Sequence, residues 1–443
     1  MLKNIKIEIL IIAVLFLNVF VSYNLDLGFY NYFSYFKDSL QKIYLKKFFE
    51  DITILGDSLW YFLISIFLIV LCYFLPKKVS LKKYNNFLNK INNFGLFLFF
   101  AVLLSGILTQ IIKHVLGRPR PNSTNFDGSF GLNFFTFDSN LHSFPSGHTA
   151  TIFSAALVFA FFVPKLKLVF YFLALIISFS RVVVGAHFIT DVVAGIAVAF
   201  IGYKVSKYIL SKYLKLDQKY FLGLYNNYFH LVLMCLVLFG VILSIAPTFD
   251  IAFSSLFYYG DKQFLIQSYY IITIFFRKII LFLIIIYILF LPIISLVVPM
   301  KKIYFDHQFN IKEIIYIWGS MLLSLVVLIN LFLKNMWGRA RPGEILELGG
   351  KNFFTPWYKI SSQCDSNCSF VSGDAAVGFS LLVLYLLIKK DVFLWMAVFF
   401  GTSIGLIRIM EGGHFFSDVV FSGLVVFLFN LFLHSYYKKR INE

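Results

Sequence analysis

Long runs of apolar residues, separated by short polar segments, dominate the pattern of this chain. Many of these runs approach the roughly 20 residues that a helix needs to cross the hydrocarbon core of a bilayer. About twelve spans are predicted, near residues 7–23, 59–75, 95–113, 147–163, 168–184, 189–209, 229–246, 279–298, 314–333, 372–388, 392–409 and 415–434. Arg277 and Lys278 interrupt the longer apolar run that contains the eighth predicted span, 279–298. The pattern predicts an all-α polytopic membrane protein.

Basic residues gather in short polar segments between the apolar runs, at residues 77–90, 204–219, 301–302, 389–390 and 438–440. Such clusters are typical of cytoplasmic loops. If the N-terminus lies inside, all five clusters fall on the cytoplasmic side. The segments 114–146 and 335–371, and the turns at 185–188 and 411–414, then meet at the opposite face.

Composition agrees with a membrane protein. Of the 443 residues, 60% are hydrophobic and 14% are charged, and the mean hydropathy is +0.82, whereas a soluble protein carries roughly a quarter charged residues. The net charge of +17 follows the topology, so no nucleic-acid partner is expected. The N-terminal apolar run lacks a small-x-small cleavage site, and we predict a retained span instead of a signal peptide.

The two halves of the chain repeat each other. Lys113 and Lys334 are 221 residues apart, and His187 and His414 are 227 apart. Smaller echoes also recur, such as Asp26 in LDLGFYNYF and Asp250 in FDIAFSSLF. We predict two fused six-helix bundles, residues 1–210 and 229–443, joined by a cytoplasmic linker at 211–228.

Each half carries the same ordered set of polar residues, Lys-x6-Arg-Pro, then Ser-Gly, then Arg-x5-His-x3-Asp. The first set comprises Lys113, Arg120, Ser146, Gly147, His148, Arg181, His187 and Asp191. The second comprises Lys334, Arg341, Ser372, Gly373, Asp374, Arg408, His414 and Asp418. Chance cannot plausibly supply this order twice.

These residue types suit the binding and attack of a phosphate group. Lysine and arginine neutralise the phosphate oxygens, and a Ser-Gly pair at a helix N-terminus offers backbone N–H groups to an anion. A histidine can attack phosphorus, and an aspartate four residues later on the same helical face can hold its tautomer. His148 suits a general acid near neutral pH. Asp374 is the catalytic candidate at this position in the second set, but a free aspartate is usually ionised, so it serves as an acid only if burial or a neighbouring anion raises its pKa. No cofactor or metal is expected.

The remaining polar residues are interpreted more simply. Cys364 and Cys368 lie in a polar loop, where a disulfide is expected if the loop is outside the cytoplasm. Arg118 and Arg339 either add to the cationic loops or face lipid headgroups. Glu411 is interpreted as a solvated loop residue. Three histidines show no partner at useful spacing in the sequence: His114, His142 and His307.

The ordered signature resembles the type 2 phosphatidic acid phosphatase (PAP2) superfamily, over both halves. The resemblance implies an extracytoplasmic site, histidine nucleophiles at His187 and His414 with partners Asp191 and Asp418, a general acid at His148, and phosphate ligands among the Lys, Arg and Ser-Gly residues above. The second half, with ISSQCDSNCSFVSGDAAVGF, is similar to bacterial lipid A 4′-phosphatases of the Francisella type, which share the paired cysteines and the aspartate after Ser-Gly. It implies a lipid A substrate at the periplasmic face of the inner membrane.

Other functions remain open at this point. The first half, FPSGHTATIFSAA, matches only the general superfamily. This resemblance leaves three candidate substrates open: the lipid A 1-phosphate, undecaprenyl pyrophosphate and phosphatidylglycerophosphate. One half can be degenerate. Twelve spans in two parallel repeats are also compatible with a transporter, but the polar residues cluster at one face and not near the midplane. Haloperoxidase chemistry is disfavoured by the membrane embedding. The sequence indicates no oligomeric state.

Overall fold

The computed structural model describes residues 23–34, 40–75, 82–122, 132–214, 228–261, 263–297 and 307–442. The chain divides into two compact units, residues 1–227 (unit 1) and 228–443 (unit 2). Each unit contains one copy of the polar set. The predicted linker lies for the most part outside the described residues, because α8 ends at Leu214 and α10 begins at Tyr228.

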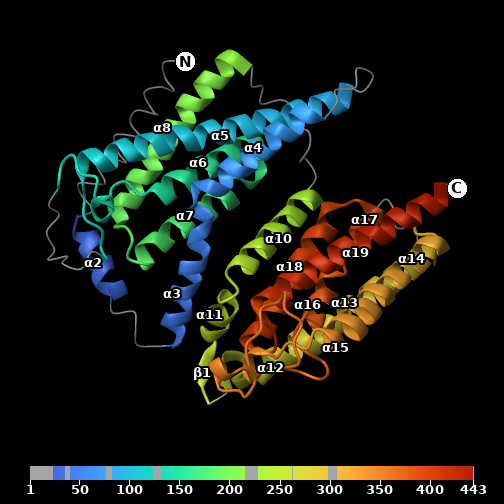
Figure 1. The fold of residues 1–443 in the computed structure, drawn as a ribbon. Helices are drawn as coiled ribbons and strands as arrows, with labels where there is room; N and C mark the ends of the chain where they lie inside the picture. Colours follow the sequence, from blue (N-terminus) through green and yellow to red (C-terminus); the bar gives the residue numbers. More distant parts are fainter. Residues whose placement is uncertain are drawn as a thin grey trace. The chain divides into compact units, whose positions relative to one another are not determined.

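Unit 1 consists of helices in its described part (Figure 1). They are α2 (Tyr23–Ser34), α3 (Leu40–Ile52), α4 (Ser58–Phe74), α5 (Lys82–Leu116), α6 (Gly147–Phe162), α7 (Lys167–Val183) and α8 (Ile189–Leu214), with short 3-10 turns η1 (Thr53–Gly56), η2 (Ser139–Leu141) and η3 (Pro164–Leu166). The loop after α5 contains Arg118 and Arg120.

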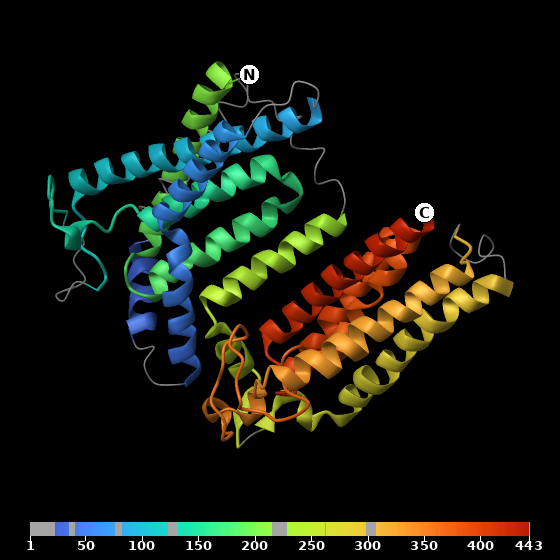
Figure 2. The ribbon, with the colours of Figure 1, turned by 45° about the vertical axis from the view of Figure 1, so that its right-hand side comes forward.

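Unit 2 repeats this plan with more irregular helices (Figure 1, Figure 2). Its elements are α10 (Tyr228–Ile245), α11 (Phe249–Ser255), β1 (Tyr258–Gly260), β2 (Gln263–Phe264), η4 (Leu265–Ser268), α12 (Tyr270–Ile274), η5 (Phe275–Ile280), α13 (Leu281–Val297), α14 (Ile311–Met321), η7 (Leu322–Leu333), α15 (Lys334–Met336), η8 (Pro342–Glu344), η9 (Leu346–Leu348), α16 (Gly373–Phe379), α17 (Leu382–Ile388), α18 (Asp391–Met410) and α19 (Phe416–Asn442). The segments η5 and η7 are π-helical. The orange loop 337–371 lies at one end of the helices, beside β1 and α12.

The all-α prediction is confirmed, with one short antiparallel hairpin, β1–β2, as the exception in the described part. Nine helices of that part are long and apolar enough to cross a membrane. Hydrocarbon offers no partner for backbone N–H and C=O groups, so apolar runs of this length adopt helices that satisfy these groups internally. The predicted span at 7–23 lies almost entirely outside the described residues.

Two predicted spans correspond to helices shorter than the roughly 20 residues of a full membrane crossing. The span at 147–163 corresponds to α6, which has 16 residues, or about 24 Å of helix. The span at 372–388 corresponds to α16 and α17, of 7 residues each. Both helices are interior elements: α6 packs against α5, α7 and α8, and α16 packs against α13, α18 and α19. Helices α6 and α16 each begin at the glycine of their Ser-Gly pair, next to the loops that carry the other site residues.

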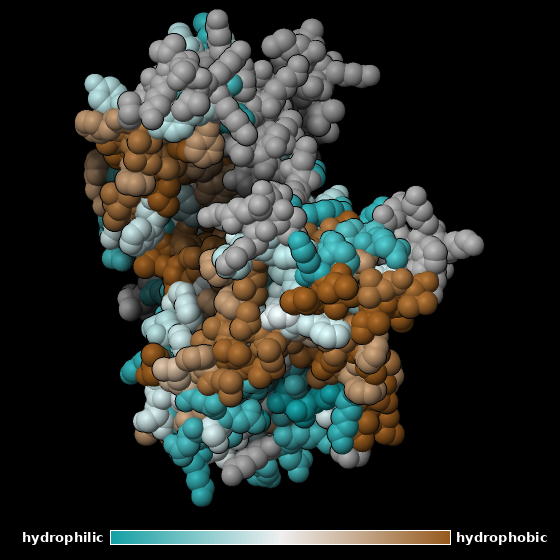
Figure 3. Space-filling view, turned by 90° about the vertical axis from the view of Figure 1, so that its right-hand side faces the viewer, coloured by the Kyte–Doolittle hydropathy of each residue, from teal (hydrophilic) through white to brown (hydrophobic). Residues whose placement is uncertain are grey.

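The outer surfaces of the helices are apolar. Figure 3 shows broad hydrophobic areas on the described part of the molecule. Large side chains exposed on these surfaces include Phe67 and Leu168 in unit 1 and Phe282 and Val297 in unit 2. Exposed apolar areas of this extent are unusual for a soluble monomer and are what lipid-facing helices require.

Candidate active site

A cavity of about 280 Å³ in unit 1 brings together most of the first predicted set. Lys113 lies near the end of α5, Arg181 lies near the end of α7, and His187 lies in the turn before α8. The other predicted residues that line the cavity are Arg120, Gly147 and His148. Three cations and two imidazoles therefore face one hollow, as the binding of a phosphate group requires.

The N-terminus of α6 completes this hollow. Ser146 caps the helix, because its Oγ accepts a hydrogen bond from the Thr149 N–H at 3.4 Å. Other N–H groups of the first turn have no partner within the helix, and the helix dipole adds partial positive charge there. Lys113 lies beside them, with its Nζ 3.6 Å from where a Cβ on Gly147 would be. A small residue and a cation at this helix end favour the binding of an anion.

His187 is in the state that a nucleophile needs. It is 3% exposed, and burial lowers its pKa to about 4 although the Asp191 carboxylate acts in the opposite direction. The imidazole is therefore neutral at neutral pH, with a free lone pair for attack. Its Nδ1 lies 3.6 Å from Asp191 Oδ2, which is longer than a normal hydrogen bond.

His414 occupies the same place in unit 2. Burial lowers its pKa to about 4 as well. Its Nδ1 lies 2.7 Å from the carbonyl oxygen of Ser369 and 3.8 Å from Asp418 Oδ2. Because a carbonyl oxygen only accepts hydrogen bonds, Nδ1 carries the proton and Nε2 keeps the lone pair.

Asp191 belongs to a centre of buried charges in unit 1. Arg118 donates from Nη1 to Asp191 and from Nη2 to Asp26 Oδ2, the latter at 2.9 Å. Asp191 Oδ2 also accepts from Ser143 Oγ at 2.6 Å and from the Phe188 N–H at 2.9 Å. The guanidinium of Arg118 lies over the ring of Phe188, 4.4 Å from its centroid. Through the Phe188 N–H, the centre holds the turn that carries His187 against the start of α8.

Unit 2 contains the same centre. Arg339 is 0% exposed and donates to Asp418 Oδ1 at 2.6 Å and to Asp250 Oδ2 at 2.8 Å. Asp418 Oδ2 accepts from the Ser369 hydroxyl and from the Phe415 N–H. Arg339 lies 4.3 Å from the ring centroid of Phe415. The two units therefore share a scaffold below the site as well as the site itself.

The predictions for these two arginines were wrong. Arg118 and Arg339 are buried ion-pair partners of the two aspartates, and neither faces lipid headgroups. Their partners come from distant helices, so local spacing does not indicate the pairing. One signal was present: the echo of Asp26 and Asp250 marks the third member of each centre.

A disulfide loop supports two cations of unit 2. Cys364 and Cys368 form the expected disulfide. The loop between them presents Asn367, whose side-chain oxygen accepts from Lys334 Nζ at 3.2 Å and whose carbonyl oxygen accepts from Arg341 Nη2 at 2.7 Å. Both cations belong to the predicted phosphate-binding set.

Replacing both cysteines of this loop with serine is expected to lower the activity of unit 2. Closing so short a loop contributes about 2 kcal/mol through the unfolded state. We expect about a tenfold loss of phosphate release, the equivalent of one hydrogen bond to a charged group. A reducing agent should have the same effect on the parent protein. Cys235→Ser in α10 is the matched control, and parental activity in the double serine variant would contradict this role.

The remaining cation of unit 2 lies in a network of charges. Arg408 Nε is 3.2 Å from Asp374 Oδ2, and Arg408 Nη1 pairs with Glu411. Arg277 joins the same network, with its Nε 3.0 Å from Asp374 Oδ2 and its Nη1 3.7 Å from Glu411 Oε2. Glu411 is therefore a buried ion-pair partner, which corrects the prediction of a solvated loop residue. Arg277 was noticed in the sequence only as an interruption of an apolar run.

The three histidines for which the sequence indicated no partner each contact a neighbouring group in the structure. His114 Nδ1 lies 2.8 Å from the carbonyl oxygen of Gln110. The rings of His114 and His142 lie 4.4 Å apart between centroids. His307 Nε2 lies 3.2 Å from Glu313 Oε1. These contacts lie outside the predicted site and help to form local structure.

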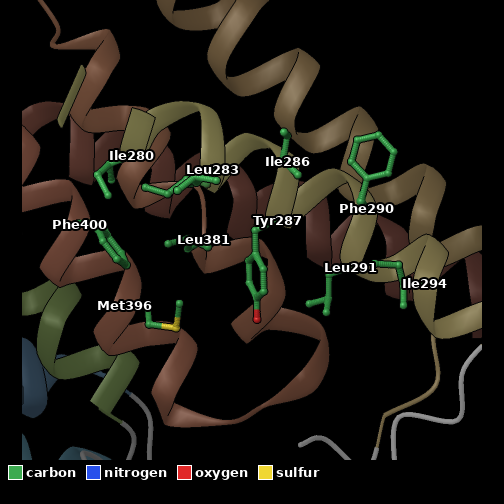
Figure 4. A pocket seen from close by; sticks show the side chains of 11 residues that line it. Ile280, Leu283, Ile286, Tyr287, Phe290, Leu291, Ile294, Leu381, Met396 and Phe400 are labelled. Atoms are coloured by element: carbon green, nitrogen blue, oxygen red, sulfur yellow. The ribbon is translucent and has the colours of Figure 1, made fainter. Parts of the chain in front are cut away.

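An apolar groove of about 520 Å³ lies along α13 of unit 2 (Figure 4). It begins at Ile280, three residues after Arg277. Along α13 it reaches Ile294, and Met396 and Phe400 of α18 also line it. Side chains from α13 and α18 surround this space in Figure 4.

Two segments of the chain, residues 94–215 and 314–442, match the model of the PAP2 superfamily. One segment lies in each unit, and together they cover more than half of the chain. The chain belongs to the PAP2 superfamily. The predicted resemblance is thereby confirmed for both halves.

Curated relatives include lipid phosphatases. The chain is 36% identical over 209 residues to a lipid A 4′-phosphatase of Francisella tularensis subsp. novicida, covering 45% of this chain and 92% of the relative. It is 35% identical over 153 residues to a lipid A 1-phosphatase of Rhizobium johnstonii, covering 33% of this chain and 61% of the relative. A lipid A 4′-phosphatase of Rhizobium leguminosarum is 39% identical over 115 residues, covering 25% of this chain and 49% of the relative. No solved structure is significantly similar.

The family and these relatives make the chain a membrane lipid phosphatase, a phosphoric monoester hydrolase. The interpretation as a transporter is not supported. The roles of the individual site residues stay predictions.

Proposed function

We propose that this protein removes phosphate groups from lipid A at the periplasmic face of the bacterial inner membrane, with a working site in each unit. The observation that carries the proposal is the complete set of three cations, a Ser-Gly helix start and a neutral, buried histidine in both units. The relatives support lipid A as the substrate.

In the proposed mechanism, phosphate oxygens bind Lys113, Arg120 and Arg181 in unit 1. Nε2 of His187 attacks phosphorus, the P–O bond to the lipid breaks, and His148 protonates the leaving oxygen. Because burial and the neighbouring cations lower the pKa of His148 to about 3, this step requires the charge of the bound phosphate dianion to raise that pKa. Water then hydrolyses the phosphohistidine and releases inorganic phosphate. The cations stabilise the charge that develops on phosphorus oxygens in the transition state.

Unit 2 uses the corresponding residues, Lys334, Arg341, Arg408 and His414. We assign the 4′-phosphate to unit 2, because its paired cysteines and Asp374 resemble the Francisella-type enzymes. Unit 1 is then assigned the other lipid A phosphate, the 1-phosphate, because a lipid A 1-phosphatase is also among the relatives of the chain. The groove beside α13 is suited to an acyl chain, since each buried CH₂ stabilises binding by about 0.8 kcal/mol.

The test is the lipid A of cells that express the chain. Lipid A that carries both phosphates is extracted from expressing cells and from vector controls, and mass spectrometry with fragmentation locates the phosphates. We expect loss at both the 1 and the 4′ positions. Unchanged lipid A phosphates would contradict the proposal, and phosphate release from undecaprenyl pyrophosphate or phosphatidylglycerophosphate instead would redirect it to those lipids.

A further inference from the structure

The two sites differ in the segment that packs against the residue after Ser-Gly, which is His148 in unit 1 and Asp374 in unit 2. The stretch Ile52-Thr53-Ile54 of unit 1 recurs as Ile272-Thr273-Ile274 in unit 2. In unit 1 the helix then breaks at η1, and α4 restarts after the cap Asp57. In unit 2 the helix continues through the π-helical segment η5. Single π-helical segments occur frequently at functional sites.

This difference changes which side chain faces the site. In unit 1, a Cβ placed on Gly56 would lie 2.9 Å from the Cβ of His148, so no side chain fits there. In unit 2, Arg277 lies against Asp374, and its Nε donates to Oδ2 at 3.0 Å. His148 and Asp374 both follow the Ser-Gly pair directly. The exchange of histidine for aspartate thus accompanies the arrival of an arginine beside it.

The charges of this cluster balance one another. Asp374 Oδ2 contacts Nε of both Arg277 and Arg408, at 3.0 Å and 3.2 Å. Glu411 pairs with Arg408 and lies 3.7 Å from Arg277. Two guanidinium groups strongly favour the charged form of a carboxylate between them. Asp374 in this arrangement has no proton to donate.

Arg277 is also accessible to a ligand. Its side chain is 39% exposed, and that of Asp374 is 28% exposed, whereas Arg408 is nearly buried. A planar guanidinium binds two oxygens of a phosphate at once. A phosphate monoester dianion carries the same total charge as the two carboxylates that contact these guanidiniums, Asp374 and Glu411.

On the basis of the proposed function of unit 2, we propose that Arg277 is an additional phosphate-binding residue of that site, and that Asp374 is its positioning residue, not the proton donor. The carboxylates of Asp374 and Glu411 hold the guanidinium groups of Arg277 and Arg408 toward the site. A phosphate monoester dianion then replaces the carboxylates as the partner of these guanidiniums. Unit 1 lacks this residue and has His148 instead.

The proposal is tested in a His187→Ala parent, so that only unit 2 turns over. Arg277→Gln and Asp374→Asn are assayed on a lipid alkyl phosphate and on p-nitrophenyl phosphate, whose leaving group needs no protonation. We expect Arg277→Gln to lower kcat/KM by about 10- to 100-fold on both substrates, and Asp374→Asn to lower both equally. The double variant should be no worse than Arg277→Gln, because the two residues act together. The adjacent exposed Lys278→Gln is the control.

Two results would overturn the proposal. One is an Arg277→Gln variant with parental kcat/KM. The other is an Asp374→Asn variant that loses activity only on the alkyl phosphate, which is the behaviour of a general acid.

An exchange of both residues gives a gain-of-function readout. Asp374→His alone places an imidazole against Arg277. Arg277→Gly with Asp374→His removes the arginine and places a histidine after Ser-Gly, as in unit 1, and we expect at least tenfold more activity than in the Asp374→His single variant. A double variant no better than the single one would count against the pairing of the two positions.

An inactive His187→Ala parent would instead show that the proposed function of unit 2 is wrong. Binding then still tests the inference, through the thermal shift that inorganic phosphate causes in the purified chain. That shift should shrink in Arg277→Gln and persist in Lys278→Gln, and an unchanged shift in Arg277→Gln overturns the inference.

Discussion

Replacing Arg339 with methionine is expected to destabilise unit 2 by about 3–5 kcal/mol, one of the two largest effects that the structure predicts. The side chain is fully buried between Asp250 and Asp418, so its loss leaves two uncompensated carboxylates inside the protein. The pKa of Asp250 is already raised by burial despite the neighbouring arginine. The measurement is the thermal unfolding of the purified protein in detergent, with an expected drop of about 10 °C.

Two variants sharpen this test. Arg341→Met removes a partly exposed cation of the same loop and should lose activity with little change in stability. Adding Asp250→Asn to Arg339→Met removes one of the unmatched charges and should restore part of the lost stability. Arg118→Met is the equivalent change in unit 1. An Arg339→Met protein that unfolds at the parental temperature would refute the structural role of this centre.

Replacing His414 with alanine is expected to reduce dephosphorylation of the lipid A 4′ position by at least about 10³-fold, because the proposed nucleophile is lost. The 1 position should still be dephosphorylated, since His187 is intact. His187→Ala should show the converse pattern, and the double variant should release phosphate from neither position. Mass spectrometry of lipid A from each strain measures all three outcomes.

His307→Ala is the matched control, because it removes a histidine of unit 2 that contacts Glu313 outside the site. If lipid A from one of the two single variants is dephosphorylated at both positions as in the parent, the unit that carries that substitution is degenerate. Only the other unit is then a working enzyme. Trapping of labelled phosphate on His414 in the His187→Ala protein, quenched with alkali because phosphohistidine is labile in acid, would support the covalent intermediate directly.

The sequence predicted the parts of this fold that depend on local pattern. Long apolar runs identified the helices. Each Ser-Gly pair was expected at a helix N-terminus, and its serine caps the helix in both units. The cavity of unit 1 collects Lys113, Arg120, His148, Arg181 and His187, as their shared chemistry indicated. The helix and cap predictions are confirmed because helical spacing and capping are properties of neighbouring residues, whereas the roles of the cavity residues stay predictions.

The residues that the sequence missed interact over long distances in the chain. Asp26 and Arg118 are 92 residues apart, and Arg277 and Asp374 are 97 apart. A single charge next to an apolar run resembles a membrane-surface anchor unless its partner is known. Glu411 differs, because its partner Arg408 is only three residues away and gave a local signal that was missed, whereas its second partner Arg277 comes from another helix.

The order of the three charges in each centre has a consequence for synthesis. Asp26 is made before Arg118, and Asp191 follows Arg118 by 73 residues, or about 4–15 seconds at typical translation rates. In unit 2 the order is the same, with Asp250 first and Asp418 79 residues after Arg339. The early aspartate can neutralise the arginine while the last helix is still in the ribosome. Its loss should therefore lower the amount of protein that inserts and survives quality control more than it lowers the turnover of the molecules that do fold.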